Sequence, residues 1–187
     1  VNEINSLNKM FYWSLHKDNE TEISAHYRTT YLCMFLRLLS GKLNEANEYL
    51  KTYINKNAQL KSYTSSFKDE AKVAKKSINK YFGKSNPINT LRNEQSFHYG
   101  NDLFGDFQEN LDDDFILYNN SENGNTLYYH SEVLKLSKML QLISDKQSSL
   151  KEDELFNAFD SLIEDITEIT GLFQTVLLEL MAVFIDK

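Results

Sequence analysis

Apolar residues recur at three-, four- or five-residue steps along much of the chain, which is the spacing of helices with one buried face. The first such segment covers residues 20–57, where Gly41 is a candidate for a bend or an interruption. A sharper pattern covers residues 65–82 and ends at Gly83, a helix stop. Apolar residues from Leu155 to Val183 predict a last helix over residues 151–185. Three shorter helices are expected at residues 88–99, 103–111 and 131–143.

Only one part of the chain has a β pattern. Residues 115–118 and 126–129 are rich in aromatic and β-branched side chains, and the turn-rich residues between them predict a hairpin. One proline and six glycines in 187 residues leave few breaks, which favours long helices. No repeat or linker divides the chain. We therefore predict a single all-α domain over residues 1–187, with a small β-hairpin insertion around residues 115–129.

The composition is that of a globular domain, with 41% hydrophobic and 25% charged residues. The longest apolar runs, residues 31–36 and 180–185, are far shorter than the roughly 20 residues that a spanning helix needs, so no membrane contact is expected. The single cysteine, Cys33, lies in an apolar run and predicts a small buried side chain in a reducing compartment. Because the first residues show neither a basic leader nor an apolar region, the expected location is the cytoplasm.

The net charge of −7 is unevenly distributed, with +6 on residues 1–100 and −13 on residues 101–187. Nucleic-acid binding responds to local charge, so a basic face on the first part could follow phosphates in an acidic protein. The alternative is that both parts have solvated faces whose charges compensate across one fold. The residues that we expect to guide RNA lie in the lysine-rich helix; they are Lys72, Lys75, Lys76 and Lys80.

The remaining motifs exclude several classes of site. None of the four histidines has the spacing of a zinc site, so no metal is expected. The phosphate-binding, dinucleotide-binding and serine-hydrolase motifs are absent, and no cofactor is expected. Residues 112–114 are three aspartates without the spacing or glycine of a calcium loop, which indicates a solvated turn.

The candidate catalytic residues lie within residues 90–100, where Arg92-Asn93 is followed, after four residues, by His98-Tyr99. With this pattern the sequence resembles the HEPN superfamily, whose ribonuclease members carry an arginine about four to six residues before a histidine. The likeness is greater to HEPN proteins associated with abortive infection. In those proteins a long helix with a segment similar to residues 36–46 precedes the Arg-Asn and Phe-His-Tyr residues. The likeness covers residues 20–145.

The resemblance implies an up-and-down helical bundle that forms a homodimer, with a composite site at the dimer interface. Arg92 then holds the phosphate, and His98 moves protons or orients the 2′-hydroxyl. Asn93 is a polar support, and Tyr99 is a packing or hydrogen-bonding neighbour. The implied activity is a metal-independent endoribonuclease that leaves 2′,3′-cyclic phosphate ends. Such an enzyme acts as a toxin or phage-defence effector, for which an antitoxin or another protein partner is expected.

Metal-free RNA cleavage needs these residue types. It requires a base for the 2′-hydroxyl proton, an acid for the leaving 5′-oxygen and a fixed positive charge on the phosphate. Histidine titrates near neutrality, and arginine stays charged and can hold two phosphate oxygens. On an unbroken helix Arg92 and His98 lie about 120° apart around the axis and about 9 Å apart along it. Either the helix bends, or two copies of the segment meet.

Two other classes stay open. A non-catalytic HEPN module would bind RNA, a nucleotide or a protein partner through the same groove and would keep its binding in His98→Ala. A helical scaffold or regulatory subunit would use the acidic residues 101–187 to recruit a basic partner. If neither residue has a functional role, Arg92 pairs with Glu94, Asp102 or another acidic residue of the C-terminal half, and His98 is a half-buried histidine at a helix end.

Overall fold

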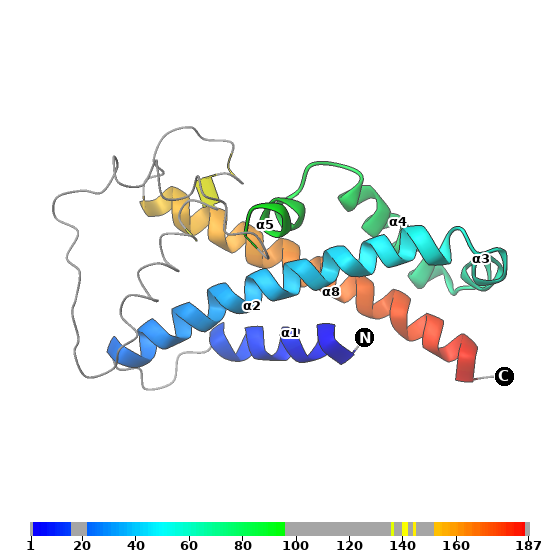
Figure 1. The fold of residues 1–187 in the computed structure, drawn as a ribbon, viewed down its shortest axis with the longest axis horizontal. Coiled ribbons are helices and arrows are strands. Elements are labelled where there is room, and N and C mark those ends of the chain that lie inside the picture. Colours follow the sequence, from blue (N-terminus) through cyan, green and yellow to red (C-terminus); the bar gives the residue numbers. More distant parts are fainter. Residues whose placement is uncertain are drawn as a thin grey trace.

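The computed structural model describes residues 2–15, 22–95, 136, 140, 141, 144 and 152–185. Within those residues the chain forms helices and no strand, so the predicted all-α class is confirmed there (Figure 1). The hairpin predicted at residues 115–129 and the short helix predicted at 103–111 lie outside the described residues. The elements are α1 (Asn2–Leu15), α2 (Glu22–Tyr49), the π-helix η1 (Leu50–Ile54), α3 (Ala58–Ser65), α4 (Asp69–Phe82), α5 (Pro87–Gln95) and α8 (Glu152–Ile185).

Two long helices, α2 and α8, organise the bundle. α1 runs antiparallel along α2, α5 packs on α2, and α4 packs on α8 (Figure 1). The apolar pattern predicted for residues 151–185 is confirmed, because it supplies the buried side of α8. None of the described helices is long and apolar enough to cross a membrane. The buried apolar residues described in α8 are Leu162, Ile166, Ile169, Phe173, Val176 and Leu180.

The sequence pattern did not predict α1, which covers the junction of α2 and α8. Its Phe11 side chain is fully buried in the core. Near its start, the carboxylate of Glu3 forms a 3.1 Å ion pair with the ammonium of Lys42 on α2. The amide of Gln174 on α8 donates a 2.8 Å hydrogen bond to the side-chain oxygen of Asn5. α1 is therefore held by both long helices.

The segment expected as one helix over residues 20–57 differs from that prediction in two ways. α2 is continuous through Gly41, so the interruption considered there does not occur. The helix then changes to a π turn, in which the Asn55 N–H donates to the Leu50 carbonyl at 3.1 Å. Asn57 begins the next helix, α3, because its side-chain oxygen accepts the Leu60 N–H at 3.1 Å.

The lysine-rich helix predicted from residue 65 begins, as α4, at Asp69. A side chain of α8 holds the start of this helix, because the Glu179 carboxylate accepts the Lys68 N–H at 3.1 Å. Its predicted stop at Gly83 is confirmed by the Gly83 N–H, which donates to the Asn79 carbonyl at 3.0 Å. A Cβ on residue 83 would lie 2.9 Å from that same oxygen, which explains why the position carries glycine. Of the helix predicted at 131–143, residues 136, 140 and 141 are described, and they are helical.

Tyr81 fastens the end of α4 to α8. Its hydroxyl donates a 2.9 Å hydrogen bond to the Asp165 carboxylate, and burial together with this bond raises the pKa of Tyr81 far above its ordinary value. We expect Tyr81→Phe to lower the free energy of unfolding by about 1 kcal/mol, because the ring stays and one hydrogen bond is lost. Urea unfolding followed by circular dichroism measures the change. Tyr49→Phe, at an exposed position, is the control; equal urea midpoints for both variants would contradict this anchoring role.

Candidate functional site

Asn86 and Pro87 set the start of α5, the helix that carries Arg92. The Asn86 side-chain oxygen accepts the Asn89 N–H at 2.9 Å, which is an N-cap, and Pro87 occupies the first helical position. The Asn86 amide also donates to two carbonyls of the preceding turn, at 2.9 and 3.3 Å. Because the Asn86 side chain is buried and bonded in both directions, the end of α4 and the start of α5 are joined rigidly.

α5 packs against α2, the helix that contains residues 36–46, the upstream segment of the resemblance. Ile88 and Leu91 are fully buried in the core. On the polar side of this contact, the side-chain amide of Asn44 donates to the side-chain oxygen of Asn89. The structure thus brings Asn44, which belongs to residues 36–46, against the helix of the Arg-Asn pair, although the two are far apart in the sequence.

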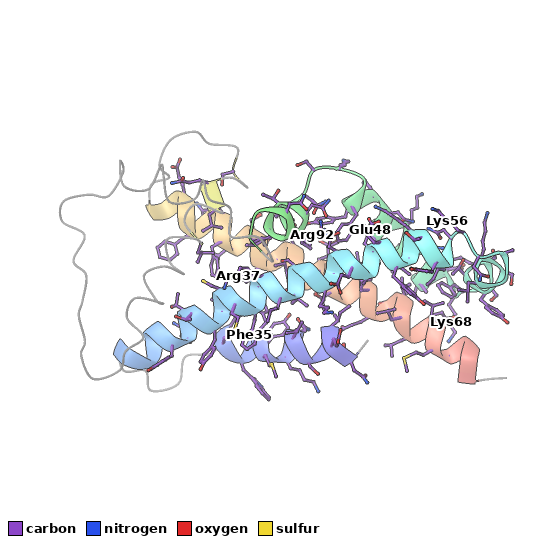
Figure 2. All side chains as sticks on the ribbon, in the orientation of Figure 1. Phe35, Arg37, Glu48, Lys56, Lys68 and Arg92 are labelled. Carbon is purple, nitrogen blue, oxygen red and sulfur yellow. The ribbon has the colours of Figure 1, made fainter. Side chains whose placement is uncertain are left out.

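Arg92 lies in the last turn of α5 and is exposed to solvent (Figure 2). Its Nη1 donates a 3.0 Å hydrogen bond to the side-chain oxygen of the neighbouring Asn93. No carboxylate among the described side chains forms an ion pair with it. Asn93 is therefore the described hydrogen-bond partner of Arg92, and its role as a polar support stays a prediction. The guanidinium has five N–H donors in all, so it can still bind an anion with its planar fork.

The other two residues of the predicted motif, His98 and Tyr99, lie outside the described residues. The description of α5 ends at Gln95, so the separation of Arg92 from His98 stays a prediction. The described geometry bears on the arginine half of the motif. There it shows a solvent-facing cation on a capped helix.

The four predicted RNA-guiding lysines do not share one face of α4. Lys72, Lys76 and Lys80 are exposed on the side away from α8, and Lys72 also pairs with the carboxylate of Asp69 at 3.5 Å. Lys75 turns toward α3 instead, where its ammonium donates a 3.2 Å hydrogen bond to the Thr64 hydroxyl. Three of the four predicted lysines therefore form an open basic face, and the fourth belongs to a different surface.

Burial sets the electrostatics of Lys75. It lowers the pKa of this ammonium, and the positive charge of Lys61 on α3 lowers it further. Its described hydrogen-bond partner is a neutral hydroxyl, so α3 and α4 hold two nearby lysines that repel one another. An anion bound between them would relieve this repulsion.

Sequence reasoning missed an exposed aromatic pair at the end of α2. Tyr49 and Tyr53 are 54% and 59% exposed, and their ring centroids lie 4.9 Å apart with 32° between the ring planes. The available signal was two tyrosines four residues apart in an expected helix, a spacing that makes side chains neighbours. We call these two residues the tyrosine pair.

The described residues contain no group of three or more histidines, cysteines, aspartates or glutamates that could hold a metal ion. Cys33 is buried in α2, as predicted. The sequence matches none of the family models, curated proteins or solved structures with which it was compared. The residues and contacts described above are therefore the basis for a proposed function.

Proposed function

We propose that this protein is a metal-independent endoribonuclease of the HEPN type. The observation that supports it most is the solvent-facing Arg92, bonded to Asn93 on a capped helix that packs against residues 36–46. An arginine that serves only to stabilise the fold normally pairs with a carboxylate, and none of the described carboxylates pairs with Arg92. A phosphodiester is the anion whose two free oxygens suit this planar fork.

The proposed reaction transfers the phosphate within the RNA chain. A base removes the proton of the 2′-hydroxyl, and the resulting oxygen attacks the phosphorus. The bond from phosphorus to the 5′-oxygen breaks, and an acid protonates that oxygen. The products are a 2′,3′-cyclic phosphate and a free 5′-hydroxyl. His98 moves these protons, and Arg92 stabilises the negative charge that grows on the phosphate.

A homodimer completes the site in this proposal. Arg92 and His98 would diverge by about 120° on a regular helix, so two copies of residues 92–98 are needed to surround one phosphate. His98 of one copy then acts on the phosphate that Arg92 of the other copy holds. The fold that we propose for each copy is an up-and-down helical bundle with a β-hairpin at residues 115–129. Lys72, Lys76 and Lys80 draw RNA toward the cleft.

In the cell such an activity must be restrained, because it would cut the RNA of its own host. We propose the role of a toxin or phage-defence effector that acts in the cytoplasm. Its partner is an antitoxin or another protein that keeps it inactive. The acidic residues 101–187 provide the charge with which a basic partner would associate.

The test is incubation of the purified protein with a mixed RNA pool in EDTA. We expect fragments with 2′,3′-cyclic phosphate and 5′-hydroxyl ends, because the proposed chemistry uses no metal ion. Gel electrophoresis shows the fragments, and mass spectrometry of their ends shows the reaction. Fragments with 3′-hydroxyl and 5′-phosphate ends would instead point to a contaminating nuclease.

A negative result has a definite meaning when the protein is a dimer. If no RNA is cut between about pH 6 and 8, where a histidine titrates, the nuclease proposal is wrong. The non-catalytic alternative would then gain support, and binding of RNA, nucleotides and proteins to the same protein would be measured next. Size-exclusion chromatography with light scattering establishes the oligomeric state first.

A further inference from the structure

The tyrosine pair stands out among the exposed apolar side chains because its two rings are in contact and also open to solvent. More than half of each side chain is exposed, and the tilt of 32° between the rings leaves their outer faces free of stacking within the pair. Exposed aromatic residues that occur singly need no explanation. Two adjoining rings on a folded helix together expose a continuous aromatic surface, which is a different feature.

The backbone under the pair is firmly held. Leu50 and Ile54, which directly follow the two tyrosines, are 2% and 3% exposed and belong to the core. The Asn57 N–H donates to the Tyr53 carbonyl at 3.1 Å, so the chain makes a further helical turn beyond the π-helix. Lys56 is exposed in that turn, three residues after Tyr53 and thus beside it. Irregular π turns of this kind are frequent at functional sites.

The surroundings of the pair are strongly basic. Residues 51–84 contain nine lysines and only two acidic residues, Asp69 and Glu70. The nearest acidic residues of α2 are already paired: Glu48 lies 3.6 Å from the ammonium of Lys51, and Glu45 lies 2.9 Å from that of Lys42. α3 contacts the π-helix and lies at the same end of the bundle (Figure 1). It carries Lys61, whose charge acts on Lys75 of α4.

We propose that this end of the protein is a binding surface for single-stranded RNA, in which the tyrosine pair stacks on bases and Lys56, Lys61 and Lys75 contact phosphates. Stacked aromatic rings beside a basic groove are the two elements that sequence-tolerant binding of single strands requires. The surface does not include Arg92, so it binds RNA whether or not the proposed cleavage occurs. It excludes duplex RNA, because paired bases have no free face for the rings.

Charge complementarity selects the occupant. An apolar helix of a protein partner would need an apolar groove, whereas Lys56 is exposed three residues after the pair and the next helix carries Lys61. Lysines spread over η1, α3 and α4 suit a ligand whose negative charges repeat along its length. Flat rings with solvent-facing surfaces suit a ligand whose bases are unstacked.

Fluorescence anisotropy with a labelled 2′-O-methyl oligouridine about twelve nucleotides long tests the proposal. The blocked 2′-hydroxyl prevents cleavage, so binding is measured alone. We expect Tyr49→Ala combined with Tyr53→Ala to weaken binding by at least about tenfold, and the two Tyr→Phe changes to keep it within about twofold. Tyr31→Ala is the matched control, since Tyr31 is 51% exposed and stacks on Phe35 elsewhere on α2. It should bind like the wild type.

The lysines give an independent measurement. Lys56→Gln and Lys61→Gln should each reduce the slope of log affinity against log salt by about 0.7, the value for one phosphate contact on a single strand. Unchanged affinity in the double alanine variant, or equal losses for single-stranded and duplex RNA, would overturn the proposal. No binding of the oligouridine by the wild type would also overturn it and would favour a protein occupant. Binding without any cleavage of unmodified RNA would support this surface while refuting the nuclease proposal.

Discussion

Arg92→Ala and His98→Ala are each expected to abolish RNA cleavage at ordinary enzyme concentrations. Loss of a general acid or base lowers such rates by about 10² to 10⁴, and loss of one charge-stabilising group lowers them by about 10² to 10³. Arg92 is exposed and has no described contact beyond Asn93, so its replacement should leave the fold intact. Initial rates on a defined single-stranded RNA measure the effect, and circular dichroism verifies the fold.

Two controls separate the role of Arg92 from that of its charge. Lys84→Ala removes an exposed positive charge from the loop just before α5 and should keep most of the activity. Arg92→Lys keeps the charge but loses the bidentate fork, and we expect it to remain at least about tenfold impaired. If Arg92→Ala cuts RNA as fast as the wild type, the arginine has no part in the reaction and the proposed site is wrong.

Mixing the two inactive variants tests the composite site. After dissociation and reassociation, some dimers contain one Arg92→Ala chain and one His98→Ala chain. In these dimers an intact Arg92 and an intact His98 meet across the interface. A composite site therefore regains part of its activity on mixing, whereas a site within one chain stays inactive.

Phe173→Ala is expected to lower the free energy of unfolding by about 3 to 5 kcal/mol, the usual cost of removing a buried aromatic ring. Phe173 is fully buried, and its ring meets that of Phe82 at a centroid distance of 6.1 Å and an angle of 64°. The substitution removes this contact and leaves a cavity between α8 and α4. Domains of this size have about 5 to 15 kcal/mol of stability, so a substantial fraction is lost.

Denaturation in urea, followed by circular dichroism, measures this change. Phe156→Ala is the matched control, because it removes the same ring from α8 at a position that is 60% exposed. We expect that control to lie within about 0.5 kcal/mol of the wild type. A loss below about 1 kcal/mol for Phe173→Ala would contradict the close packing of α4 on α8.

The long helices could be predicted from the sequence because each buries one continuous side. In α8 the apolar residues from Leu162 to Leu180 keep three- and four-residue steps, and all six of these positions, including both ends, are buried. The sequence pattern did not predict α1 because part of its exposed side is apolar, like its buried side. Met10, Tyr12 and Trp13 are exposed beside the buried Phe11, so the pattern around the helix is blurred.

Other features left no periodic signal. Leu50 and Ile54 are four residues apart, which suits a buried side in either an α-helix or a π-helix, so the π turn could not be distinguished. The sequence could, however, have shown that Lys75 lies on a different side of α4 from the other three lysines. On a regular helix Lys76 and Lys80 lie about 40° and 80° from Lys72 on one side, while Lys75 lies about 60° away on the other.

The sequence predicted a short helix over residues 88–99 that carries Arg92, and α5 confirms a helix at its described residues. Its anchoring did not follow from the pattern, because it depends on contacts between distant segments. Asn44 and Asn89 are 45 residues apart, and no local rule pairs them. Asn86 reads as a turn residue in the sequence, but in the structure it joins two helices through three hydrogen bonds.

The reliance of α4 on α8 has a consequence for synthesis. α8 follows all the other described helices, so the ribosome makes it after them, yet it supplies the Glu179 carboxylate at the start of α4 and the ring that covers Phe82. Until α8 emerges, the nascent chain carries an uncovered apolar surface that chaperones would have to shield. We therefore expect a prematurely terminated chain, which lacks α8, to fold poorly and to lack the proposed cleavage activity beside the ribosome.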